Sequence, residues 1–137
     1  MTFETTVGIR YADLDTYGHV NNAVYGTLIE EARIDYLEAA IPEAIEQITG
    51  SESPIGIVLA NLELDFERPL RPTDDVTVAV EVPSLGDSSI PFEYEISDDH
   101  GLVATGETTV VVIDREAGTA REIPEQWRAG IDSFEGR

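Results

Sequence analysis

The sequence predicts an α+β protein in which one long helix packs on one face of an antiparallel sheet. Residues 22–41 carry apolar side chains at helical spacing, with charged residues on the other side. Most of the remaining chain alternates apolar and polar residues with period two, the pattern of half-buried strands. The order is one strand, the long helix and then four strands, which favours an antiparallel sheet with the helix on one face.

The first strand is expected at residues 3–9, and a polar loop follows it through Gly18. The long helix then begins at a cap formed by Asn21 or Asn22 and ends before Pro42, which disfavours helical geometry at the preceding residue. Pro42 starts a second short helix that ends before Gly50. Gly26 costs the long helix about 1 kcal/mol relative to Ala, which predicts that something approaches its backbone closely.

Four further strands are expected after the helices. They span residues 58–67, 76–82, 92–96 and 102–113, with hairpin-type turns at 85–88 and 98–101. Beyond Pro124, the apolar Trp127 and Ile131 indicate a short helix docked at the edge. No repeat, linker or low-complexity segment divides the chain, so residues 1–137 are expected to form a single domain.

The charge is strongly negative, because 28 acidic residues face only 8 basic ones and the net charge is −20. All basic residues are Arg, since the sequence has no Lys. This field repels phosphate backbones, so neither nucleic acid nor an anionic membrane is expected as a partner. A Lys-free acidic composition is typical of proteins from salt-accumulating cytosols, and we expect salt to relieve the self-repulsion. An ordinary acidic protein from a Lys-poor, GC-rich genome is the alternative.

Several classes of site are excluded by composition. Without Cys there is no disulfide, thiolate catalysis or Cys-ligated metal centre. The two His residues, His19 and His100, lie far apart without ligand-spaced partners, so no metal is expected. No apolar run approaches the roughly 20 residues of a transmembrane helix, and the first residues lack a signal-peptide layout. We therefore expect a cytoplasmic protein.

The densest group of reactive side chains lies between the first strand and the long helix. It contains Asp13, Asp15, His19, Asn21 and Asn22. Each has an ordinary structural role open to it: loop turns for the carboxylates, helix capping for the amides and a solvated or core position for the imidazole. However, the free amides and positive dipole end of the helix would stabilise a carbonyl oxygen that gains negative charge. We therefore expect the functional site here.

The stretch RYADLDTYGHVNNAVY at residues 10–25, followed by EEAR at 30–33, resembles the signature of the 4-hydroxybenzoyl-CoA thioesterase-like family of hotdog-fold acyl-CoA thioesterases. The resemblance extends over nearly the whole chain, including the Arg68-Pro69 step. It implies a hotdog fold, in which the sheet wraps the long helix. It also implies a homodimer or a dimer-of-dimers tetramer with active sites at the interface. The implied activity is hydrolysis of an acyl-CoA to free acid and CoA, without a metal or organic cofactor.

The resemblance also assigns roles. Asp15 falls at the family's catalytic carboxylate and acts as nucleophile or as general base, and the backbone N–H of Asn22 polarises the thioester carbonyl. The spacing from Asp15 through His19 to Asn22 is similar to the D-x-N-x-H-V-N-N step of plant acyl-carrier-protein thioesterases, with Tyr17 in place of the Asn. His19 is accordingly a catalytic candidate or a structural residue, and the carrier is either CoA or an acyl-carrier protein.

Five residues are candidates for substrate binding: Tyr25, Arg68, Arg71, Ser88 and Ser89. The two Arg residues are suited to the phosphates of CoA, or else they pair with acidic neighbours, namely Glu67, Asp74 and Asp75. The two Ser residues are hydrogen-bond donors near the acyl group, or turn residues.

The sequence leaves two alternative functions open. A non-catalytic acyl-CoA-binding dimer would bind the thioester without cleaving it. A hotdog dehydratase or hydratase would act on the same substrates, but it normally presents a His with a helix acid rather than a loop Asp.

Overall fold

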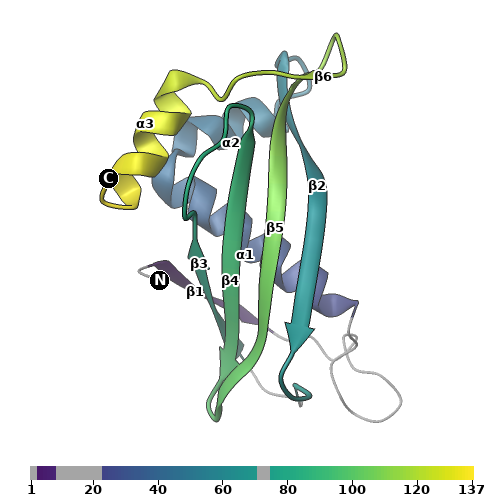
Figure 1. The fold of residues 1–137 in the computed structure, drawn as a ribbon, viewed down its shortest axis with the longest axis vertical. Coiled ribbons are helices and arrows are strands. Elements are labelled where there is room, and N and C mark those ends of the chain that lie inside the picture. Colours follow the sequence, from purple (N-terminus) through teal and green to yellow (C-terminus); the bar gives the residue numbers. More distant parts are fainter. Residues whose placement is uncertain (1–2, 9–22, 71–74) are drawn as a thin grey trace.

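The computed structural model describes residues 3–8, 23–70 and 75–137. Figure 1 shows the predicted α+β arrangement, a curved antiparallel sheet with the long helix α1 packed on one face. The elements in chain order are β1 (Phe3–Gly8), α1 (Val24–Ala40), α2 (Pro42–Thr49), β2 (Ile55–Phe66), β3 (Asp75–Glu81), β4 (Ser89–Asp98), β5 (Gly101–Asp114), β6 (Thr119–Ala120) and α3 (Glu125–Phe134). The predicted caps of α1, Asn21 and Asn22, lie outside the described residues.

The strands of the sheet do not follow chain order. They are arranged β1-β3-β4-β5-β2, and the short β6 pairs with β5. The predicted four-strand run is therefore antiparallel but not continuous, because β2 pairs with β5 instead of β3. The result is that β2 stands at the edge of the sheet (Figure 1).

The core lies between α1 and the sheet. The helix buries Tyr25, Leu28, Ile29, Ala32 and Tyr36 toward the strands. The three central strands of the sheet contribute the other buried side chains of this core, among them Val78, Val80, Phe92, Tyr94, Val110 and Val112. Each large apolar side chain buried in this way contributes about 1.5–3 kcal/mol, so the helix–sheet contact is the main source of stability.

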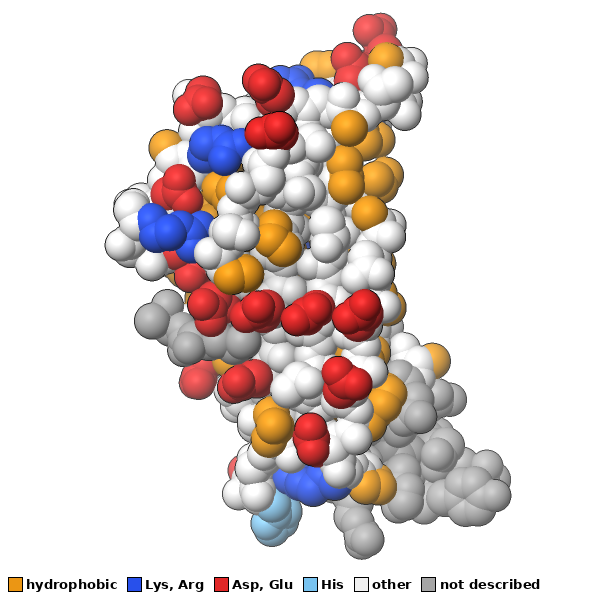
Figure 2. Space-filling model, viewed as in Figure 1, with side chains coloured by type: hydrophobic (Ala, Val, Ile, Leu, Met, Phe, Trp, Pro, Cys, Tyr) orange, Lys and Arg blue, Asp and Glu red, His pale blue; other side chains and the backbone are white. Residues whose placement is uncertain are grey.

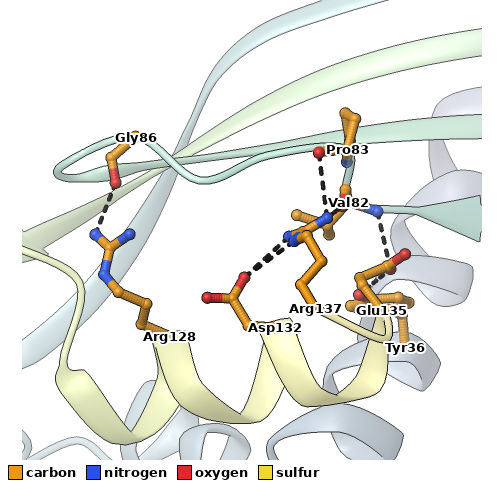
Figure 3. A network of polar contacts seen from close by, with 8 residues as sticks. All are labelled: Tyr36, Val82, Pro83, Gly86, Arg128, Asp132, Glu135 and Arg137. Carbon is orange, nitrogen blue, oxygen red and sulfur yellow. Dashed lines mark hydrogen bonds and ion pairs between the residues drawn. The ribbon is translucent and has the colours of Figure 1, made fainter.

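The C-terminal helix α3 packs against the end of α1, with Trp127 and Ile131 buried. A Cβ atom on Gly130 would lie 2.4 Å from Ile41 Cγ2, so only glycine permits this close approach. Figure 3 shows how polar contacts fix the helix. The Glu135 carboxylate accepts hydrogen bonds from the Tyr36 hydroxyl and, at 3.1 Å, from the Val82 backbone N–H. The tail thus forms the predicted helix and connects α1 to the residue that follows β3.

The face of the sheet turned away from α1 is acidic. Glu63, Glu107, Glu93 and Glu81 stand directly opposite one another on β2, β5, β4 and β3. Figure 2 shows them as one row across the sheet, which we call the glutamate row. A shallow hollow of about 320 Å³ lies over it, lined by acidic side chains and holding none of the predicted site residues. No helix in the described part of the chain is long and apolar enough to span a membrane.

Candidate active site

The predicted site lies at the start of α1. Three of its residues, Asp15, His19 and Asn22, lie outside the described residues, as does Arg71. What the structure describes is the helix that follows them. The first amides of a helix have no partners within it, and α1 has no acidic residue in its first turn to offset the positive end of its dipole.

Tyr25 is buried at this end of α1. Its ring meets Phe66 of β2 edge-on, with the centroids 4.9 Å apart. Burial raises the pKa of the Tyr25 hydroxyl above its ordinary value, and a hydrogen bond at the Leu70 backbone opposes that rise. The structure therefore places Tyr25 in the core beside the predicted site, while its contact with substrate stays a prediction.

Gly26 follows Tyr25 in the first turn of α1. A Cβ atom at this position would meet no described atom within 4 Å. The described residues therefore do not supply the close approach predicted for Gly26, and they leave open space beside the first turn of the helix.

Arg68 lies at the same end of the sheet. Its Nη1 donates to Asp98 Oδ2 at 3.0 Å, its Nη2 donates to Asp98 Oδ1, and Nη2 also donates to the Gly101 carbonyl at 3.1 Å. These bonds hold the pKa of the Asp98 carboxyl below its usual range. Among the described residues, the partner of Arg68 is thus Asp98, 30 positions away, and not Glu67 or Asp75; Asp74 lies outside the described residues. The phosphate contact stays a prediction, and the Asp98 fork would orient the guanidinium for it.

Ser88 and Ser89 lie at the opposite end of the sheet from the start of α1. Ser89 pairs with Val111, whereas Phe66, the neighbour of Tyr25, pairs with Ala104. The Ser88 carbonyl accepts from the Val112 N–H and the Ser89 carbonyl from the Gly86 N–H, each at 2.9 Å. Their backbones therefore serve the turn before β4, and a role beside the acyl group stays a prediction.

A groove between α1 and β2 escaped the sequence analysis. The side of β2 that faces α1 can be assigned by its partners, since Leu59, Leu62 and Phe66 stand opposite the buried Val110, Thr108 and Ala104. These three side chains are nevertheless 49%, 44% and 46% exposed, because α1 does not cover the edge strand. They form an apolar strip, which we call the α1–β2 groove.

The groove has a cavity of about 190 Å³ at the end remote from Tyr25. Its lining combines α1, α2 and β2 and comprises Glu30, Arg33, Ile34, Leu37, Ile45, Ile48, Thr49 and Ile57. Near the middle, Arg33 Nη1 lies 3.4 Å from the Tyr94 hydroxyl, which is bonded to Thr108 Oγ1 at 2.7 Å. Burial raises the pKa of Tyr94. Apart from this polar contact beneath α1, the lining is mainly aliphatic.

A β-bulge, which appears only in the strand pairing, hid the groove from the sequence analysis. The alternation of Val58, Ala60, Leu62, Leu64 and Phe66 suggested a single apolar face. The register shifts between Leu59 and Asn61, so Ala60 is unpaired and Val58 pairs with Val111. Val58 therefore lies on the face away from α1, whereas Leu59 and Leu62 share the helix side.

The described residues contain no group of three His, Cys, Asp or Glu side chains that could hold a metal ion. The described part of the site offers helix-end amides, an apolar groove and a guanidinium held by Asp98.

Comparison with known proteins shows which family the chain resembles in sequence and fold. The long-chain acyl-CoA thioesterase FadM of Escherichia coli is 30% identical over 133 residues, which cover 96% of this chain and 98% of that protein. A thioesterase of Thermus thermophilus solved with coenzyme A and Zn is 34% identical, with a TM-score of 0.82 over 98% of this chain and 94% of that one. The DHNA-CoA thioesterase of Staphylococcus aureus is 21% identical and shares the fold, with a TM-score of 0.83 over 97% of this chain and 90% of that one.

Residues 9–131 match the Thioesterase-like superfamily, and this span includes both the predicted catalytic stretch and every described residue of the α1–β2 groove. The fold and the sequence agree, and the chain belongs to the Thioesterase-like superfamily of hotdog proteins.

Proposed function

We propose that this thioester hydrolase cleaves acyl-CoA to free acid and CoA at the start of α1, with Asp15 as the catalytic carboxylate. The observation that carries the proposal is the meeting of three features at one end of the sheet. These are the amide end of α1, the opening of the α1–β2 groove at Tyr25 and Phe66, and the oriented guanidinium of Arg68.

The proposed chemistry uses both the carboxylate and the helix end. As a nucleophile, Asp15 attacks the thioester carbonyl, CoA leaves as the thiolate and takes up a proton, and water hydrolyses the resulting anhydride. As a general base, Asp15 instead takes a proton from the water that attacks the carbonyl. In both routes negative charge develops on the carbonyl oxygen, and the Asn22 N–H at the helix start stabilises it. His19 is the second catalytic candidate, and it acts only if its imidazole reaches the water or the carboxylate.

We further propose that CoA is the carrier and that Arg68 and Arg71 bind its phosphates. The related Thermus thermophilus thioesterase was solved with coenzyme A, which supports CoA over an acyl-carrier protein. With a net charge of −20, most of the surface repels phosphate, so binding depends on the few Arg residues. The same acidic surface supports the proposal that the protein is adapted to a salt-rich cytoplasm.

The active form is proposed to be a homodimer, or a tetramer built from two such dimers. β2 is an edge strand of 12 residues whose outer backbone groups pair with no described strand. Such an edge invites pairing with a second copy, and the exposed Leu59, Leu62 and Phe66 would be covered in the process. Light scattering in high salt checks this, and a stable monomer of 15.0 kDa would contradict it.

The test of function is release of free thiol from a panel of acyl-CoAs. Asp15→Asn is expected to keep the fold and the oligomer but to lower turnover by two or more orders of magnitude. More than about a tenth of wild-type turnover would remove Asp15 from the mechanism. His19→Ala is expected to cost less, and normal kinetics would return His19 to a structural role.

The same panel separates the alternatives. A non-catalytic binding protein would bind acyl-CoA tightly without releasing thiol. A dehydratase or hydratase would change the mass of the acyl-CoA by one water and leave the thioester intact.

A further inference from the structure

We infer that a second copy of the chain pairs with β2 in one register, which is antiparallel and centred on Ala60 and Asn61. In this register Asp65 of each copy meets Arg115 of the other. The inference rests on the proposed dimer and deepens it, because it names the residues that select the register and those that the second copy adds beside the proposed site.

The β-bulge in β2 limits the registers that are possible. Residues directly opposite each other in an antiparallel pair have their side chains on the same face of the sheet. Leu59 before the bulge and Leu62 after it both lie on the α1 side, whereas Val58 and Glu63 both lie on the other face. Leu59 therefore matches Leu62 of a second copy, and Val58 matches Glu63. A shift by one residue would oppose side chains of different faces. The matching register pairs all 12 residues of β2.

The charges of β2 favour the same register. Its first half, residues 55–60, is uncharged, and its second half, residues 61–66, contains Glu63 and Asp65. Pairing centred on Ala60 and Asn61 places the acidic half of each copy beside the uncharged half of the other. Pairing centred on Glu63 would instead bring the acidic halves together and join the two glutamate rows end to end. Like charges directly opposite one another in a sheet are destabilising.

A cation stands at the position where Asp65 meets the second copy. In the inferred register Asp65 is opposite Gly56 of that copy. Both residues lie on the face turned away from α1, like their β5 partners Thr105 and Ile113. Arg115 covers Gly56 on this face, since a Cβ atom on Gly56 would lie 2.7 Å from Arg115 Nε. Both Nη atoms of Arg115 donate to backbone carbonyls at the end of α2, which holds the guanidinium in place. The register thus gives each Asp65 carboxylate a guanidinium, twice per dimer.

The second copy also adds a surface beside the proposed site. Phe66, which is 46% exposed and touches Tyr25, stands opposite Ile55 of the second copy. Leu64 stands opposite Ile57 in the same register, on the α1 side of the sheet. The second copy therefore supplies an aliphatic wall next to the start of α1, where the described part of a single chain leaves Phe66 open.

Disulfide crosslinking measures the register, because the sequence contains no Cys and introduced pairs on β2 join two copies. The double variant Val58→Cys with Glu63→Cys is expected to form a covalent dimer of twice the 15.0 kDa chain mass on mild oxidation, since directly opposite Cβ atoms lie about 5 Å apart. Each single variant is a matched control, because the same position in two copies would be about 15 Å apart along the strands. Crosslinking of Glu63→Cys alone, or none in the double variant, would overturn the register.

Charge reversal tests the ion pair. Asp65→Arg is expected to raise the Kd of the dimer about tenfold at 0.1 M KCl, although it lowers the net negative charge. The matched control is Glu95→Arg, which makes the same change on an exposed residue of β4, away from the edge, and should not raise Kd. Adding Arg115→Asp to Asp65→Arg is expected to recover most of the lost affinity. Equal effects of Asp65→Arg and Glu95→Arg, or no recovery on the charge swap, would refute the pair.

The outcomes separate this inference from the proposed function. A stable monomer in light scattering would refute the dimer and this inference together. A dimer that crosslinks in another register would refute the inference alone, and thiol release by that dimer would still support the proposed function. Thiol release that falls as Asp65→Arg dissociates the dimer, and returns with the charge swap, would support the contribution of the second copy to the site.

Discussion

Replacing Glu107 by Gln is expected to stabilise the protein at low salt, because Glu107 occupies the middle of the glutamate row. Its side chain stands directly between Glu63 on β2 and Glu93 on β4. Side chains opposite one another in an antiparallel pair have Cβ atoms about 5 Å apart, and like charges in such positions are destabilising. One substitution removes two of these contacts.

The magnitude follows from Coulomb's law. Two charges about 5 Å apart in water repel by about 0.8 kcal/mol before screening, so two neighbours contribute about 1.7 kcal/mol. Screening with a Debye length of about 10 Å at 0.1 M salt reduces this to about 1 kcal/mol, and about 3 Å at 1 M reduces it to about 0.3 kcal/mol. For a domain of this size we expect the melting temperature to rise by about 3–5 °C at 0.1 M KCl.

Thermal melts from 0.1 to 3 M KCl provide the assay. The control is Glu116→Gln, which removes the same charge from the exposed turn between β5 and β6. Wild type is expected to gain stability up to about 1 M, and Glu107→Gln to gain less, so that the two converge. If Glu107→Gln and Glu116→Gln change the melting temperature equally at low salt, the glutamate row carries no special repulsion. A wild-type melting temperature that stays flat or falls as KCl rises would mean that the acidic surface is no salt adaptation.

Two further changes test contacts that fix the fold. Arg68 lowers the pKa of Asp98, so the ion pair stabilises the folded state above the ordinary carboxyl pKa of about 4, and this contribution is lost as the pH falls through the lowered value. Asp98→Asn should therefore destabilise the protein at pH 7 in urea titrations, and progressively less toward pH 3. An equal loss of stability at both pH values would contradict the pairing. Tyr36→Phe removes the hydroxyl that donates to Glu135 and should lower the free energy of unfolding by about 1 kcal/mol. An unchanged urea midpoint would show that the hydrogen bond from the Val82 N–H holds Glu135 in place without the Tyr36 hydroxyl.

The sequence predicted the elements better than their arrangement. Helical and strand periodicities are local, which is why α1, α2 and the main strands appear close to their predicted positions. Which strands become neighbours depends on tertiary pairing, so the position of β2 beside β5 could not be read from alternation. The unpaired Ala60 preserved an apparent period-two pattern while moving Val58 to the other face.

The site residues likewise fall into those that a local motif predicts and those that depend on the tertiary structure. The catalytic candidates follow from a contiguous motif, and their placement lies outside the described residues. Arg68 was predicted to bind phosphate or to pair with an acidic sequence neighbour. Among the described residues it pairs with Asp98 at the adjacent end of β4, which only the folded sheet brings near. The α1–β2 groove depends on how far a helix covers an edge strand, and no local pattern encodes that.

The pairing of β1 with β3 bears on the route by which the chain folds. Phe3 pairs with Val80, so closing this contact requires α1, α2 and β2 to be laid down between the two strands. The hairpin of β4 and β5, by contrast, closes across the Asp99–His100 turn at small entropic cost. During synthesis the first strand has no partner until about 80 residues have emerged. We therefore expect the sheet to grow outward from its central strands, with β1 adding late and its amides exchanging with solvent sooner than those of β4.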